Sequence, residues 1–97
     1  MSCYVIAQIR IKDPVEYKKY LDGFDAIFEQ YRGLVVLVDE DPVILEGEWP
    51  YTRTVMIRFP DEEEARRWYD SPEYQELAKY RWDAAESNIV LVRRKPS

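Results

Sequence analysis

Four strand patterns and two helix patterns alternate along this sequence, and their order restricts the possible folds. Residues 4–11 and 52–59 alternate with a period of two, which indicates strands that present two different faces. Shorter apolar runs at 34–38 and 88–92 also have the length of strands. The remaining segments therefore have to form the helices and turns that connect these four strands.

The first helix pattern begins with residue types that cap helices. Asp13 is the expected N-cap, Pro14 is the expected first helical residue, and Glu16 completes a capping box. An apolar stripe with spacings of three and four follows, formed by Tyr17, Tyr20, Leu21, Phe24, Ile27, Phe28 and Tyr31. Gly33 comes where a left-handed residue often ends a helix, so we expect that conformation there.

The second helix pattern begins in the same way and contains an internal restart. Asp61 is the expected N-cap, and Glu64 follows three residues later. Ser71 and Pro72 then supply a fresh cap within the same helical region. The apolar stripe continues beyond this restart through Tyr74, Leu77, Ala78, Arg81 and Ala85.

The order strand, helix, strand, strand, helix, strand predicts an α+β domain of the ferredoxin-like kind. Two helices are expected on one face of a four-stranded antiparallel sheet. We also expect a short edge segment at 43–45, after a turn at 39–42. A chain of 97 residues has room for one such core, so 1–97 is predicted to be a single domain.

The sheet face that the helices leave open is predicted to be apolar. Tyr4, Ile6 and Met56 belong to it, together with members of the runs at 34–38 and 89–92. Because such a face is too apolar to remain in water, we expect a second copy of the chain to cover it. The sequence therefore predicts a homodimer that forms through the open sheet faces.

Composition excludes several classes of function. The chain has no histidine and one cysteine, so imidazole catalysis and zinc sites are not expected, and we predict neither a metal nor a cofactor. The net charge of -5 argues against nucleic acid as a partner, and no apolar stretch reaches the length of a membrane span. A lone cysteine also favours the cytoplasm as the location.

Glu46 and Arg10 are the main candidates for chemistry. Glu46 follows a predicted strand end close to Trp49 and is the predicted proton acceptor. Desolvation beside Trp49 would raise the pKa of its carboxyl group, whereas Arg10 in the same pocket would lower it, so the sequence leaves the direction open. Arg10 is predicted to face the same pocket and to anchor an anionic ligand. Surface ion pairs are the competing interpretation for both residues. The full set of predicted ligand-binding residues is Tyr4, Gln8, Arg10, Trp49 and Arg53.

Several short motifs between residues 4 and 92 resemble the domain of unknown function 1330 family. They are Asp13-Pro14 with Tyr17 and Tyr20, Glu46-Gly47 with Trp49, Phe59-Pro60, and Trp68-Tyr69-x-Ser71-Pro72-x-Tyr74 with Leu77 and Arg81. The resemblance implies the dimeric α/β-barrel form of the ferredoxin-like fold, but it implies no particular activity.

Two functions stay open at this point. One is a cofactor-independent enzyme or binding protein that holds a small anionic organic molecule in a pocket of the dimer, by analogy with other dimeric barrels. The other is a non-catalytic module whose dimerisation is its function. A concave site with an arginine opposite an unpaired acid would favour the first.

Overall fold

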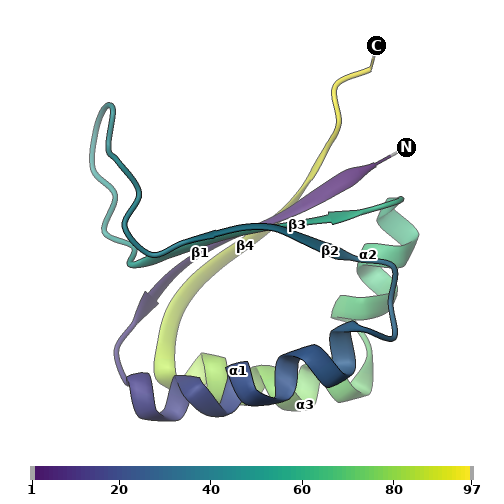
Figure 1. Ribbon diagram of the computed structural model, residues 1–97, viewed down its shortest axis with the longest axis horizontal. Helices are drawn as coiled ribbons and strands as arrows, with labels where there is room; N and C mark the ends of the chain where they lie inside the picture. The colour runs from purple at the N-terminus through teal and green to yellow at the C-terminus, as the bar shows by residue number, and fades with distance from the viewer. Residues whose placement is uncertain (1, 97) are drawn as a thin grey trace.

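The computed structural model describes residues 2–96 and places all the helices on one face of a single sheet (Figure 1). The elements in chain order are β1 (Cys3–Ile11), α1 (Pro14–Phe28), β2 (Leu34–Asp39), β3 (Arg53–Phe59), α2 (Glu62–Tyr69), α3 (Pro72–Ala84) and β4 (Ala85–Arg93). The strand order is β2-β3-β1-β4, and every neighbouring pair is antiparallel. The predicted α+β class and four-stranded antiparallel sheet are confirmed.

The second helical region consists of two helices, so the predicted total of two is wrong. Helix α2 ends at Tyr69, and Ser71 caps α3 by accepting a hydrogen bond from the Tyr74 N–H at 3.2 Å. Pro72 explains the break, because the residue before a proline is disfavoured in helical conformation, and Ser71 is extended with φ -62° and ψ 141°. No helix within 2–96 has the length and apolar content needed to cross a membrane.

The predicted edge segment at 43–45 is not a strand. Residues 40–52 form a long connection between β2 and β3, which projects from the sheet in Figure 1. At its end the Thr52 N–H donates a hydrogen bond to the Ile9 carbonyl of β1 at 2.9 Å, whereas residues 43–45 pair with no strand. Val43 and Leu45 are 85% and 95% exposed. Without a neighbouring strand, this apolar run has no ladder to join.

The two faces of β1 have different environments. Val5, Ala7 and Ile9 are buried beneath the helices, whereas Ile6 and Gln8 lie on the uncovered face and are partly exposed. Pairing with β4 continues to the very end of β1, and for this reason β4 begins at Ala85 rather than at residue 88. The sheet therefore has one face inside the protein and one face open.

Gly33 does not adopt the expected left-handed conformation. Gly47, with φ of 80°, is the glycine with positive φ among the described residues, and the C-cap of α1 is instead Glu29, with φ of -64°. Gly33 is needed for space, since a Cβ atom there would lie 2.5 Å from Phe28 Cζ and 2.7 Å from Phe59 Cε1. These two rings pack against Trp68 at centroid distances of 5.7 Å and 5.5 Å, so neither can move aside freely.

We expect Gly33→Ala to lower the free energy of unfolding by about 1–3 kcal/mol, the usual cost of overpacking a core. Gly23→Ala is the matched control, because its Cβ would meet only the flexible end of Leu77 while alanine also favours the helix. That variant should change stability by about 1 kcal/mol or less. Urea unfolding followed by circular dichroism measures both variants, and equal stabilities for the two would contradict this account of Gly33.

Candidate functional site

A cavity of about 440 Å³ lies between the sheet and the helices. Its walls are mainly aliphatic and aromatic, with a few polar groups, as in most small-molecule sites. The sheet contributes Val5, Ala7, Ile9, Val35, Val38, Arg53, Val55, Ile57 and Ile89, and the helices contribute Tyr17, Tyr20, Leu21, Phe24, Asp25, Trp68, Tyr74 and Arg81. The volume is enough for a compact organic molecule.

The aromatic side chains keep the cavity open by packing on one another. The Trp68 ring centroid lies 4.4 Å from that of Tyr74 and 6.1 Å from that of Phe24. On the opposite wall, the central strand contributes Ala7, whose methyl group is too short to fill the space. The cavity is thus bounded by a fixed aromatic cluster on the helices and a small residue on the sheet.

Arg81 is a buried cation in this cavity. The residue is 3% exposed, and its Nη1 donates a hydrogen bond to Ser87 Oγ at 2.7 Å. Its guanidinium carbon lies 5.6 Å from the centroid of the Tyr20 ring. Its Nε and Nη2 atoms are buried without a hydrogen-bond partner, and no acidic side chain within 2–96 forms an ion pair with it. A buried charge with free donors normally requires an acceptor.

Two tyrosine hydroxyl groups form a hydrogen-bonded pair beside Arg81. The Tyr20 and Tyr74 oxygens are 2.7 Å apart and buried. Burial raises the pKa of Tyr20 well above its usual value and also raises the pKa of Tyr74, although Arg81 acts in the opposite direction on both. Both hydroxyls are therefore protonated at neutral pH. Because one donates to the other, the accepting hydroxyl retains a proton that it can donate to a ligand.

Arg53 brings a second guanidinium group to the cavity wall. Its Nη1 donates to Glu40 Oε1 at 2.6 Å, and its guanidinium carbon lies 5.9 Å from the Tyr17 ring centroid. Arg53 Nε and Trp68 Nε1 are also buried and have no partner in the part of the chain that the structure describes. The buried lining groups without partners are thus all donors, which suits a ligand that carries acceptor oxygens.

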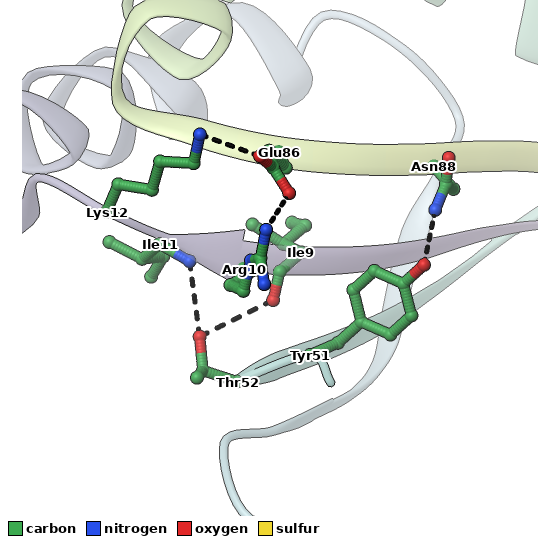
Figure 2. Close-up of polar contacts among 8 residues, drawn as sticks. All are labelled: Ile9, Arg10, Ile11, Lys12, Tyr51, Thr52, Glu86 and Asn88. Atoms are coloured by element: carbon green, nitrogen blue, oxygen red, sulfur yellow. Dashed lines mark hydrogen bonds and ion pairs between the residues drawn. The ribbon is translucent and has the colours of Figure 1, made fainter. Parts of the chain in front are cut away.

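The structure places the predicted ligand-binding residues on different surfaces. Arg53 lines the cavity, whereas Tyr4, Gln8 and Arg10 lie on the opposite, open face of the sheet. Arg10 forms an ion pair with Glu86, which also accepts from Lys12 Nζ at 2.7 Å (Figure 2). Lys12 and Arg10 together lower the pKa of the Glu86 carboxyl group. Arg10 therefore has the environment of a surface ion pair.

Glu46 and Trp49 lie in the connection between β2 and β3. Glu46 is exposed and forms no side-chain hydrogen bond or ion pair with any residue from 2 to 96, and neither residue lines the cavity. The Trp49 ring packs edge-on against Tyr51 at 5.7 Å, and the Tyr51 hydroxyl accepts a hydrogen bond from Asn88 Nδ2 at 2.7 Å (Figure 2). The structure does not bring Glu46, Arg10 and Arg53 to one site.

The sequence interpretation missed Arg81 as a site residue, although a signal was present. Arg81 continues the apolar stripe of α3, two turns after Tyr74. The positions three and four residues before and after it are Leu77, Ala78, Ala84 and Ala85, so no acid can pair with it along its own helix. An arginine on a buried stripe without a local acid indicates a polar site.

The described residues offer little for a metal ion or a thiol-based reaction. No group of three or more His, Cys, Asp or Glu side chains within 2–96 could hold a metal ion. Cys3 is buried, and burial is the main cause of the raised pKa of its thiol group. The polar groups that line the cavity are arginine, tyrosine and tryptophan donors and the Asp25 carboxylate.

Comparison with models of known protein families identifies the family of this chain. The model of the family described as domain of unknown function (DUF1330) matches residues 2–94. The chain belongs to the DUF1330 family. The match confirms the resemblance seen in the sequence motifs, and no curated protein matches this DUF1330 chain.

Solved structures similar to the DUF1330 chain share its fold at low sequence identity. RPA0582 from Rhodopseudomonas palustris, a protein of unknown function, is 20% identical over 98% of this chain and 84% of its own, with a TM-score of 0.78. SnoaB from Streptomyces nogalater, a cofactor-independent oxygenase, is 14% identical over 99% of this chain and 95% of its own, with a TM-score of 0.69. A dimeric ferredoxin-like protein of unknown function from Jannaschia sp. CCS1 is 8% identical over 97% of this chain and 100% of its own, with a TM-score of 0.71.

We expect Arg81→Met to leave the free energy of unfolding unchanged or to raise it by up to about 2 kcal/mol. Methionine fills similar space, and it removes a buried charge that has no acidic partner, at the loss of one hydrogen bond to Ser87. Arg53→Met is the control, because its guanidinium is already paired with Glu40. Urea unfolding of the purified protein provides the measurement. A loss of more than about 2 kcal/mol in Arg81→Met would make Arg81 a structural residue.

Proposed function

We propose that this DUF1330 protein binds a small organic anion in the cavity between its sheet and helices, as a homodimer of the α/β-barrel kind. The observation that carries the proposal is the burial of Arg81 without an acidic partner. Folding removes this charge from water and leaves two of its donors unused. A ligand anion would complete those hydrogen bonds and neutralise the charge.

The walls of the cavity favour an organic ligand over an inorganic ion. Val5, Ala7 and Ile57 on the sheet and Trp68 on the helices supply apolar surface around the polar groups. An apolar ligand body would gain by leaving water for such a lining. The anionic group would lie at Arg81, and the rest of the molecule would extend along the apolar walls.

The same donors would support a reaction that passes through an oxyanion. Neutral tyrosine hydroxyls and a guanidinium group stabilise negative charge that develops on an enolate or phenolate oxygen. Asp25, at the exposed edge, is the one acidic residue in the cavity lining described, so the proton lost when the oxyanion forms would pass to this carboxylate or to water. We therefore propose cofactor-independent chemistry of this kind if the bound anion reacts. SnoaB, which shares the fold, is itself described as a cofactor-independent oxygenase.

The open face of the sheet supports the homodimer. Ile6 lies between Met56 on β3 and Val90 on β4, so the three form an apolar row across the face. Val90 is 54% exposed, and the connection 40–52 exposes further apolar side chains. A second copy covering this face would remove the apolar surface from water. The similar proteins from Jannaschia sp. CCS1 and Thermobifida fusca are described as dimeric.

A non-catalytic dimerisation module remains the second candidate. The apolar open face favours it, since that face serves dimerisation whether or not the cavity is occupied. Such a module gives no reason for the free donors of Arg81. The two candidates therefore differ in whether anions bind in the cavity. For either one we propose the cytoplasm, since the one cysteine, Cys3, is unpaired and buried.

We expect Val90→Glu to convert the dimer into a monomer, because each interface would then bury two like charges in apolar surroundings. Val15→Glu makes the same chemical change on α1, where Val15 is 77% exposed, and should leave the dimer intact. Sedimentation velocity at about 10 μM distinguishes a species of twice the chain mass from a single chain. A monomeric wild type, or dissociation in both variants, would contradict the proposed interface.

We expect small organic anions to raise the melting temperature of the wild type, whereas their neutral analogues should not. Ligand that binds only the folded state stabilises it by about 2.7 kcal/mol at one hundred times Kd. Ala7→Leu should abolish the effect by filling the cavity, and Ala26→Leu on the exposed side of α1 is the matched control. A thermal-shift series with carboxylates, sulfonates and phosphates makes the measurement. The absence of any anion effect, or an equal effect in Ala7→Leu, would favour the dimerisation module.

A further inference from the structure

We propose that the anion bound in the cavity is an apolar monocarboxylate, and that its two oxygens contact the Nε and Nη2 edge of Arg81. This inference rests on the proposed function and adds the chemical class of the ligand. It follows from which guanidinium atoms are occupied and from the charge that remains in the cavity.

The free atoms of Arg81 have the arrangement that a carboxylate requires. Nη1 is occupied by the hydrogen bond to Ser87 Oγ at 2.7 Å. Nε and Nη2, both buried and without partners, form one edge of the planar guanidinium group. The two N–H bonds on this edge are parallel and match the two oxygens of a carboxylate. Ser87 thus fixes the group while its bidentate edge stays available.

The charge in the cavity matches a single negative charge. Glu40 already neutralises Arg53 through a contact of 2.6 Å, and the Asp25 carboxylate lies at the exposed edge of the lining, so Arg81 is the one buried cation there without an acidic partner among residues 2–96. A carboxylate bound to Arg81 would form a neutral ion pair with it. A phosphate dianion would bring a second charge into an apolar space with no free cation to balance it. The monoanion is therefore favoured over the dianion.

The surroundings of Arg81 also determine where the carboxylate would lie. Arg81 lines a second hollow, beside β4, together with Tyr69, Trp82 and Ser87. The main cavity is the better position, because it also contains the Tyr20 and Tyr74 hydroxyl pair and the unpartnered Trp68 Nε1. These donors would reach a carboxylate oxygen or a second oxygen on the ligand. The apolar walls would then surround the rest of the molecule.

The test measures the binding of charged ligands and their neutral analogues to the wild type and to variants. The ligand pairs test the charge of the ligand, and the variants test the geometry of the guanidinium group. The probes are benzoate, phenylacetate and 4-methylpentanoate, each compared with its amide, and benzoate is also compared with phenylphosphonate. Titration calorimetry on the intact wild-type protein gives Kd. We expect at least one carboxylate to bind at least about ten times more tightly than its amide. The reason is that the charged carboxylate accepts stronger hydrogen bonds from the guanidinium group than the neutral amide does.

Arg81→Lys keeps the positive charge and loses the two-point edge, so we expect Kd for that carboxylate to rise about 10- to 100-fold. Arg66→Lys on α2 is the matched control and should change Kd by less than about threefold, because Arg66 is exposed, forms an ion pair with Glu62 and does not line the cavity. Ala7→Leu should abolish binding, whereas Trp82→Ala should leave Kd unchanged. Urea unfolding and sedimentation confirm that each variant is folded.

Three results would overturn the inference while the proposed function stands. The first is an equal loss of carboxylate affinity in Arg81→Lys and Arg66→Lys, and the second is tighter binding of phenylphosphonate than of benzoate. The third is carboxylate binding that is lost in Trp82→Ala but kept in Ala7→Leu, with other anions still binding in the wild-type cavity. If no anion of any class binds the folded wild type, the proposed function fails as well. If anions bind but no carboxylate binds better than its amide, the carboxylate assignment alone fails.

Discussion

The side chains of β1 point alternately to the two faces of the sheet, and both surfaces of this protein depend on that alternation. Val5 and Ala7 point to the helices and line the cavity, whereas Ile6 points to the open face. Hydrogen-bonded pairing with β3 on one side and β4 on the other fixes the register of β1. A slip by one residue would exchange the two faces completely. The cavity and the apolar row of the open face are therefore specified together.

The cavity persists because the residues around it are held by contacts that do not involve the cavity. Trp68 packs against Tyr74 and Phe59, and Phe59 in turn packs against Phe28, where Gly33 leaves the necessary space. This frame is rigid enough to present Arg81 without collapsing around it. A buried cation of this kind reduces stability when no anion is present. Its presence in a largely apolar lining is easier to explain by ligand recognition than by folding.

The helix caps that the sequence predicted correctly rest on local interactions. Asp13, Asp61 and Ser71 each accept the expected backbone hydrogen bond three residues on, because a helix cap depends only on adjacent residues. Glu46 was selected for its proximity to Trp49 in sequence, but the exposed connection keeps it away from the cavity. Arg81 was missed because only the tertiary structure shows that its neighbour is Ser87 and not an acid. Charge pairing across elements cannot be inferred from spacing alone.

The entrance of the cavity connects the proposed binding site with the proposed dimer. Val35 and Val38 of β2 line the cavity but are 38% and 45% exposed, so the opening lies on the side where no helix covers β2. The connection 40–52 begins at this edge with Glu40, which forms the ion pair with Arg53. A second copy that covered the exposed apolar part of this connection would also restrict Glu40. The ion pair that neutralises Arg53 within one chain would then be held more firmly in the assembled dimer, and Arg81 would stay the one buried cation of the cavity without an acidic partner among residues 2–96.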